Sequence, residues 1–260
     1  MNFKKKAEIE LMRKAGVLLW QAHQLAGEMA EAGTTTEAID AEVEKFIIGH
    51  NATPLFKGVP GEVPFPATCC ISVNEEVVHG IPSARELANG DIVSFDIGLK
   101  LNGWCADCAC THAVGDIDDE KRQLMDVTEE CLHIAIKEIH PNIKWSKIAK
   151  KMAKHARNAG FSVVETLVGH GIGKEMWELP QVPNYFSRGC TDFRLKQGMV
   201  IAVEPMINVG TKEVETLSDH WTIVTKDRKP ACHFEHTIAV TASGAKVMTC
   251  GPNGEAWAMK

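Results

Sequence analysis

The sequence predicts an α+β fold made of two related halves. In two places a glycine is followed by an apolar strand and then, at the same distance, by an acid; these stretches are Gly90–Asp96 and Gly198–Glu204. A His-Gly-Ile tripeptide precedes each of them, at His79 and at His170. In each half two helical patterns come before the strands, so we expect pseudo-symmetric halves with antiparallel sheets and flanking helices.

The halves, at roughly 1–115 and 116–260, are expected to form a single domain that covers residues 1–260. No low-complexity linker separates them, whereas loosely joined domains usually have one. A chain of 260 residues is long enough for one large core or for two merged subdomains.

In the first half, apolar residues from Leu11 to Ala26 recur at helical spacing and predict a helix. Threonines at 34–36 followed by Glu37 offer N-cap residues before a second helix that reaches Ile48. The segment Asn51–Pro66 is rich in proline and glycine and predicts an irregular loop. Strands are expected at 70–73, 77–78 and 92–97.

The second half repeats this order. A long helix is predicted from Gln123 to Ile139, and it ends before Pro141 because the residue that precedes a proline disfavours helix. A further helix is expected over Trp145–Asn158, with Gly160 as its C-cap. Strands are expected near 163–164, 199–203, 220–224 and 235–240.

Composition excludes several classes of protein. Apolar residues make up 45% and charged residues 24%, which is typical of a globular protein. The net charge of −6 argues against a general or specific nucleic-acid binder. No apolar run approaches the ~18 residues of a membrane span, and the first residues lack the apolar core of a signal peptide. We therefore expect a cytoplasmic protein that does not bind membranes and acts as a monomer.

The nine cysteines indicate reduced thiols, because their number is odd and the chain is too large to need disulfides. Cys105, Cys108 and Cys110 resemble a zinc-ligand spacing. If this segment is a strand, Cys108 and Cys110 face away from Cys105, so a shared zinc ion is not expected.

Asp96 and Asp107 lie on either side of a turn signal at 101–103. In a hairpin centred there, the two acids are directly opposed or diagonal by two residues, and in both registers their side chains share one face. Two carboxylates that close repel each other unless a proton or a cation lies between them. A solvent-facing acidic pair is the alternative, but Phe95 and Trp104 favour buried strands.

Three further residues become informative as a set, although each alone has an ordinary structural explanation. His170 lies among glycines, Glu204 ends an apolar strand, and Glu235 leads into another. Together with Asp96 and Asp107 they supply four carboxylates and one imidazole, which suit Mn²⁺, Fe²⁺, Co²⁺ or Zn²⁺ in a catalytic role. Five side chains fit two ions better than one, and paired ions ~3.5–4 Å apart are typical of hydrolytic enzymes.

The order and spacing of these five residues resemble the methionine aminopeptidases, which have the pita-bread fold. The resemblance covers nearly the whole chain and includes further motifs: Cys70–Glu75, His79–Pro82, Gly169–Gly173, Glu204–Pro205 and Phe234–Thr237. The short gap between His170 and Glu204 is similar to the compact bacterial-type form of type I. The resemblance implies hydrolytic removal of the initiator methionine from nascent polypeptides and peptides by a dinuclear metallo-aminopeptidase.

The resemblance also implies a role for each metal ligand. Asp107 and Glu235 would bridge both ions, Asp96 would complete the shell of one ion, and His170 with Glu204 would complete that of the other. Two such ions would lower the pKa of a shared water toward ~7.

The same resemblance assigns catalytic and substrate-binding residues. Glu204 would accept and pass on a proton, and His79 would hydrogen-bond at the scissile amide. Phe65, Cys70 and Trp221 match positions that line the methionine pocket, although ordinary core packing also explains them.

Three positions depart from the family pattern. Trp177 stands where a second, substrate-binding histidine is expected, and an indole can donate a hydrogen bond but cannot act as a base. Met176 replaces a bulky aromatic residue, and His233 replaces a glutamine close to Glu235, where it could perturb or join the metal shell. These departures bear on turnover rate, metal preference and residue specificity.

Two other functions remain open alongside the main hypothesis. One is an Xaa-Pro-type aminopeptidase or dipeptidase on the same scaffold. The other is a catalytically impaired pita-bread module that binds protein or RNA. The departures from the family pattern at Trp177 and His233 suggest this alternative.

A stripe of basic residues recurs at helical spacing in the second half, at Lys147, Lys150, Lys151, Lys154 and Arg157. A solvated helix face explains it most simply. Docking to ribosomal RNA near emerging nascent chains is the alternative.

Overall fold

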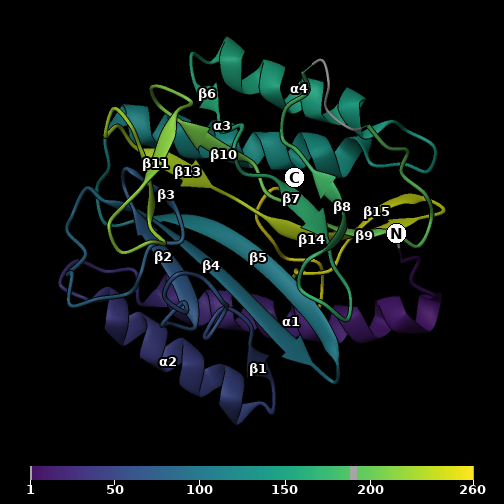
Figure 1. The fold of residues 1–260 in the computed structure, drawn as a ribbon, viewed down its shortest axis with the longest axis horizontal. Coiled ribbons are helices and arrows are strands. Elements are labelled where there is room, and N and C mark those ends of the chain that lie inside the picture. Colours follow the sequence, from purple (N-terminus) through teal and green to yellow (C-terminus); the bar gives the residue numbers. More distant parts are fainter. Residues whose placement is uncertain (1, 188–191, 260) are drawn as a thin grey trace.

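The computed structural model describes residues 2–187 and 192–259, and within them the chain has the expected α+β architecture. Two helices of the first half lie on one side of the strands and two helices of the second half lie on the other (Figure 1). They are α1 (Lys6–Glu28), α2 (Thr36–Gly49), α3 (Asp119–Glu138) and α4 (Trp145–Asn158).

The first-half sheet is organised around one long hairpin. Strands β4 (Ile92–Leu101) and β5 (Trp104–Ala113) pair along their whole length. Asn102 and Gly103 form the turn, and both have positive φ, as an Asn-Gly hairpin turn requires. On its other edge β4 pairs with β1 (Thr53–Pro54) and β2 (Cys69–Val73).

The second-half sheet has five antiparallel strands in the order β15-β14-β9-β7-β8. Their bounds are β7 (Gly169–Gly171), β8 (Glu178–Val182), β9 (Val200–Val203), β14 (His236–Thr241) and β15 (Gly244–Val247).

The described residues also form two smaller sheets. One contains β13 (Ala231–His233), β10 (Met206–Asn208) and β6 (Ser162–Val163). The other contains β11 (Val214–Thr216), β12 (Ile223–Thr225) and β3 (Glu76–Val78), so that a second-half strand pairs with a first-half strand.

Helix α1 packs on the β4–β5 hairpin through a face that includes the buried Ala15, Leu19 and Ala22. Gly16 lies on this helix where a Cβ would come within 2.0 Å of the carbonyl oxygen of Met248, so the glycine permits close backbone contact. Leu11, which the periodicity placed on the apolar face, is exposed instead.

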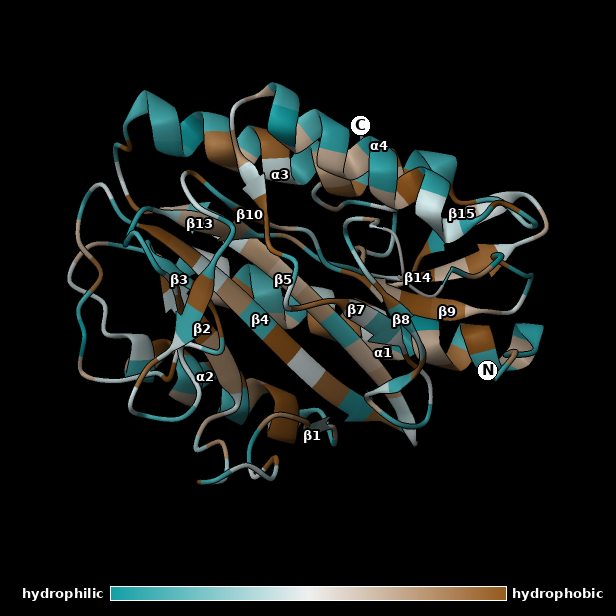
Figure 2. Cartoon of the chain, turned by 45° about the horizontal axis from the view of Figure 1, so that its top comes forward, coloured by the Kyte–Doolittle hydropathy of each residue, from teal (hydrophilic) through white to brown (hydrophobic). Residues whose placement is uncertain are grey.

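The remaining helices follow the sequence predictions closely. The Thr35 side chain caps α2 by accepting a hydrogen bond from the amide of Ala38. Helix α3 begins four residues before Gln123, because the Asp118 side chain caps it. Helix α4 has the predicted bounds and carries hydrophobic and hydrophilic residues along its length (Figure 2), with its five basic residues exposed.

The two halves are joined by hydrogen bonds between β5 and the start of β14. The amide of Glu235 donates to the carbonyl of Ala109 at 2.8 Å. The Thr237 hydroxyl donates to the carbonyl of Asp107 at 2.8 Å and accepts from its amide at 3.1 Å. The Cys108 thiol donates to the Glu235 carbonyl at 3.0 Å. These contacts hold residues 107–109 against residues 235–237, and we call this junction the seam.

The strand predictions differ from the structure at several places. Strand β4 continues past Ile97 to the turn, and the segment Asn51–Pro66 is irregular except for β1. The strand expected from His220 begins at Ile223, because His220 has a positive φ and belongs to a turn. No helix in residues 2–187 or 192–259 has the length and apolarity needed to cross a membrane.

Candidate active site

The hairpin brings the two aspartates to one face. Asp96 is opposite Ala109, and Asp107 is opposite Gly98, so the acids are diagonal by two residues. This is one of the two predicted registers, and side-chain alternation places both carboxylates on the same side. Asp107 is buried, Asp96 is half-buried, and both line an internal cavity, so the two carboxylates do not form a solvent-facing acidic pair.

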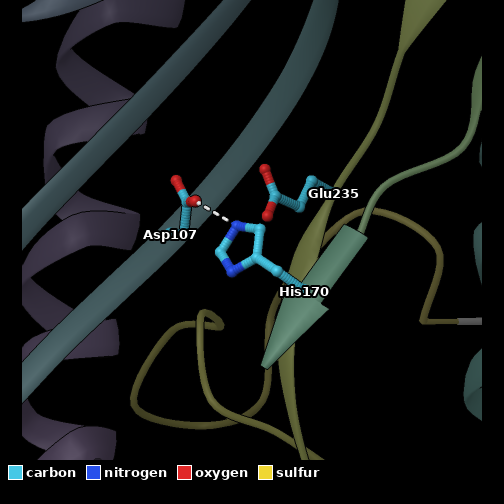
Figure 3. Close-up of side chains that lie close together, drawn as sticks. All are labelled: Asp107, His170 and Glu235. Atoms are coloured by element: carbon cyan, nitrogen blue, oxygen red, sulfur yellow. Dashed lines mark ion pairs between the residues drawn. The ribbon is translucent and has the colours of Figure 1, made fainter. Parts of the chain in front are cut away.

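Three residues of the second half lie beside this pair. His170 is in β7, Glu204 directly follows β9, and Glu235 occupies the short break between β13 and β14. Figure 3 shows the side chains of His170, Glu235 and Asp107 directed toward one another. Their candidate ligand atoms all lie within 4.8 Å of one another, which makes a candidate metal site.

His170 is oriented for this role by its own backbone. Its Nδ1 lies 2.9 Å from the carbonyl oxygen of Gly171, so that Nδ1–H donates there and Nε2 faces the acids. Nε2 lies 3.4 Å from Asp107 Oδ2 and 3.9 Å from Glu204 Oε1. Burial lowers the pKa of His170, but the hydrogen bond to Asp107 and the charges of Glu204 and Asp107 outweigh it and raise the pKa to about 9.

The carboxylates are held close together, Asp107 and Glu235 buried and Asp96 and Glu204 half-buried. Burial, with the charge of Asp107, raises the pKa of Glu204 to about 7 against the opposing effect of His170. Burial and the neighbouring carboxylates raise the pKa of Asp96 and of Glu235 well above their usual range. One oxygen of each of these two residues, Asp96 Oδ1 and Glu235 Oε1, is buried without a hydrogen-bond partner.

Unpartnered oxygens and mutually repelling carboxylates fit bound divalent cations, which would supply the missing partner and charge. One imidazole and four carboxylates form a donor set suited to transition metals with catalytic function. The fold and this site together define a class, the metallohydrolases.

The cluster forms part of the wall of a cavity of about 460 Å³. All five residues with predicted roles in substrate contact also line it: Phe65, Cys70, His79, Trp177 and Trp221. Phe65 and Cys70 are buried. The Trp221 ring meets the Phe65 ring edge-on at 5.3 Å and the His79 ring at 6.3 Å.

His79 directly follows β3. Its φ of 59° is unusual for a residue with a side chain, and the following Gly80 is necessary because a Cβ there would lie 2.2 Å from the carbonyl oxygen of Ile71. Burial lowers the pKa of His79 to about 4, so the ring is neutral at pH 7 and has one N–H to donate.

The three departures from the family pattern occupy different environments. Trp177 is largely exposed, and its ring lies edge-on to His170 at 6.5 Å between centroids. Met176 is buried and packs with Phe56 over Gly98, where a Cβ would meet the Met176 methyl at 2.7 Å. His233 is buried, its Nε2 has no partner, and it is not in the compact group of ligand atoms found among the described residues.

Sequence reasoning missed several apolar residues of the cavity wall. They include Phe56, Val59, Leu167, Leu179 and Met206. Leu167 and Met206 lie within three residues of the predicted ligands His170 and Glu204, and this proximity was the available signal. Leu179 lies two residues after Trp177, so the same signal applied to it, whereas nothing in the sequence placed Phe56 and Val59 at the cavity.

The cysteine motif is divided between the faces of β5, as strand alternation predicted. Cys105 is on the same face as Asp107, whereas Cys108 and Cys110 are on the other. Cys108 instead takes part in the seam through its bond to Glu235.

Comparisons with known proteins give the family. Residues 10–242 match metallopeptidase family M24. The methionine aminopeptidase 1 of Bacillus subtilis is 44% identical over 93% of this chain and 96% of its own length. The crystal structure of a methionine aminopeptidase from Thermotoga maritima superposes with a TM-score of 0.91, at 38% identity over 96% of this chain and 99% of that chain.

The chain therefore belongs to metallopeptidase family M24 and, within it, to the methionine aminopeptidases. The fold is the pita-bread fold of this family. A prolidase from Pyrococcus furiosus shares that fold with a TM-score of 0.77 but only 24% identity, so the Xaa-Pro alternative is not favoured.

Proposed function

We propose that the chain hydrolyses the peptide bond after an N-terminal methionine, in peptides and in nascent polypeptides. The observation that carries this proposal is the set of four carboxylates and one imidazole that lines a cavity with apolar walls, with the ligand atoms of Asp107, His170 and Glu235 close together. An enzyme of this class needs both parts, because the apolar wall binds the methionine side chain and the polar cluster carries the chemistry.

We propose that Asp96, Asp107, His170, Glu204 and Glu235 hold two divalent ions, of Mn, Fe, Co or Zn. The four carboxylates and the two unpartnered oxygens support this count, since the charges of four acids balance two dications. When bound, the ions supply Lewis acidity and lower the pKa of the attacking water.

The residues of the chain then have separate tasks. Glu204 accepts a proton from water and returns it to the leaving amine. The neutral His79 donates a hydrogen bond at the scissile amide. Phe65, Cys70 and Trp221 bind the methionine side chain, and Trp177 contacts the peptide beyond it.

We also propose that the two halves work as one catalytic domain, cytoplasmic and monomeric. Asp96 and Asp107 come from the first half and the other three ligands from the second, so neither half has a complete set. The seam supports this proposal because it joins the halves beside Asp107 and Glu235.

The test is an assay of the purified protein, with Mn²⁺, Fe²⁺, Co²⁺ or Zn²⁺, on Met-Ala and Xaa-Pro peptides. We expect methionine to be released from Met-Ala peptides and no release from Xaa-Pro peptides. No methionine with any metal would refute the proposal. Metal analysis of protein prepared without chelator distinguishes the enzyme from the catalytically impaired binding module. About two ions per chain favour the enzyme, and no bound metal, even after reconstitution, favours the module.

A further proposal concerns where in the cell the protein encounters nascent polypeptides. All five basic residues of α4 are exposed, although Lys151 pairs with Glu138 at 2.6 Å and Lys150 lies over the Phe186 ring. We propose that this face docks on ribosomal RNA. Co-sedimentation with ribosomes should weaken as salt rises, and Lys147→Glu with Lys154→Glu should abolish it. Ribosome binding that is unaffected by salt and by the two substitutions would contradict the proposal.

A further inference from the structure

The mouth of the cavity has an apolar surface that the methionine pocket does not use. Two exposed apolar side chains flank Glu178 there: Trp177 is 56% exposed and Leu179 is 71% exposed, and both line the cavity. Val63, also largely exposed, is tied to this wall because Trp221 Nε1 donates to its carbonyl at 2.7 Å. Exposed apolar groups gathered at a cavity mouth mark a surface that becomes covered on binding.

The segment that carries these side chains is held in place before any ligand arrives. Lys4 Nζ binds the Glu178 carboxylate at 2.7 Å, in an ion pair that is almost completely buried. The same carboxylate accepts a hydrogen bond from the amide of Lys174 at 3.2 Å. Trp177 and Leu179 are therefore presented on a fixed support, which lowers the entropic cost of using them for binding.

The distance from Trp177 to the proposed reaction centre indicates which residue of a substrate Trp177 can contact. The Trp177 ring centre lies 6.5 Å from that of His170, whose Nε2 faces the acids of the proposed reaction centre. An extended peptide advances about 3.3 Å per residue, so two residues span about 7 Å. A substrate with its first residue in the buried pocket leaves through the mouth, and its third residue then reaches Trp177.

We propose that Trp177 and Leu179 form an apolar rim that selects substrates with an apolar third residue. This inference rests on the proposed function. The rim makes side-chain contacts and does not pair with the peptide as an added strand, because Pro180, next to Leu179 on the edge strand β8, has no amide hydrogen to donate.

The experiment compares kcat and KM for Met-Ala-Leu-Gly, Met-Ala-Phe-Gly and Met-Ala-Ser-Gly in the metal-loaded protein. An aromatic or aliphatic contact of this kind favours the leucine and phenylalanine peptides by about three- to tenfold in kcat/KM. The difference should lie in KM, with kcat unchanged, because the contact is made equally in the ground state and the transition state.

Three variants distinguish a side-chain contact at the rim from a general loss of activity. Trp177→Ala should bring the ratio of leucine to serine peptides close to one, and Trp177→Phe should keep most of it. Ile48→Ala is the matched control, because Ile48 is also 56% exposed but lies on α2 and does not line the cavity. It should leave the ratio unchanged.

Each outcome decides between the two claims. If methionine is released but all three peptides are equivalent, or if Trp177→Ala keeps the wild-type ratio, the rim is refuted and the proposed function stands. If Trp177→Ala slows all three peptides by the same factor, Trp177 has a structural role and the rim is also refuted. If no peptide releases methionine, the proposed function fails and the inference fails with it.

Discussion

Asp96 and Asp107 lie within long, fully paired strands, whereas Glu204 and Glu235 lie where short strands end. The first pair is held by ten-residue strands that hydrogen-bond along their whole length. The second pair takes its place from the chain direction just after β9 and just before β14. The metal-ligand candidates of the first half thus lie within regular strands, whereas Glu204 and Glu235 of the second half lie in the short segments between strands.

The difference has a consequence for how the site is kept together. Carboxylates inside a hairpin are placed by register alone, because alternation decides the face. Carboxylates at strand ends need tertiary contacts: the seam supplies them for Glu235 through Cys108, and the Asn184 side chain donates to the backbone carbonyl of Glu204 at 2.9 Å. The comparison predicts that the hairpin residues tolerate substitution structurally, while the position of Glu235 depends on the seam.

The largest effect is expected from Asp107→Asn. The amide keeps the shape of the side chain but cannot bridge two cations as a carboxylate does, so kcat/KM should fall by more than about a hundredfold. Because the paired hairpin places this residue, thermal unfolding should remain cooperative with an intact fold. Peptide assays and circular dichroism check this, and near-normal turnover would contradict the assignment.

Metal removal should make stability depend on pH. In the metal-free chain the folded pKa of Glu204 is raised from 4.5 to about 7, and that of His170 from 6.5 to about 9. A group whose pKa is higher in the folded than in the unfolded chain stabilises the folded state at pH values below its unfolded pKa. This stabilisation is lost as the pH rises through its folded pKa. Stability should therefore fall between about pH 4.5 and pH 9, by on the order of 3 kcal/mol for each of the two groups taken separately.

Unfolding in chelator at a series of pH values measures this fall. Glu204→Gln should reduce the fall but not abolish it, because Asp107 still raises the pKa of His170. Added Mn²⁺ should restore stability most at high pH, where the carboxylates are charged. Stability that rises with pH in the metal-free protein would show that the acids are not crowded as described.

A smaller effect is expected at the seam. Thr237→Val removes the hydroxyl that binds both backbone groups of Asp107 and leaves them buried, which should cost about 1–3 kcal/mol of unfolding free energy. Turnover should fall as well, because Asp107 and Glu235 lose their common support. Thr237→Ser keeps the hydroxyl and is the control; if it is as unstable as the valine variant, the loss comes from packing.

The smallest effect is expected at Trp177. Trp177→His places an imidazole beside His170 and should raise kcat/KM on a polar Met-Ala-Ser peptide by a few-fold, on the order of 1 kcal/mol, since a histidine can hydrogen-bond the peptide. Unchanged kinetics would show that the tryptophan does not hinder this contact.

The sequence predicted most of the helices and the hairpin because these are local. Thr35 and Asp118 cap their helices through contacts within the same turn, and the Asn102-Gly103 turn centres the hairpin. Short strands such as β7, β10 and β13 were missed, because three residues carry too little alternation to be recognised and exist only through pairing with distant strands.

Local pattern and family resemblance together indicated all five acidic and imidazole residues, and only the hairpin pair could be placed on a common face from spacing alone. The sequence by itself determined the residue types, the caps and the turn, because these depend on neighbours along the chain. Tertiary structure decided that His170 and Glu235 meet Asp107, and that Trp177 and Leu179 stand exposed at the mouth of the cavity. Such contacts join residues far apart in sequence, and they depend on how the two halves pack, which no local pattern records.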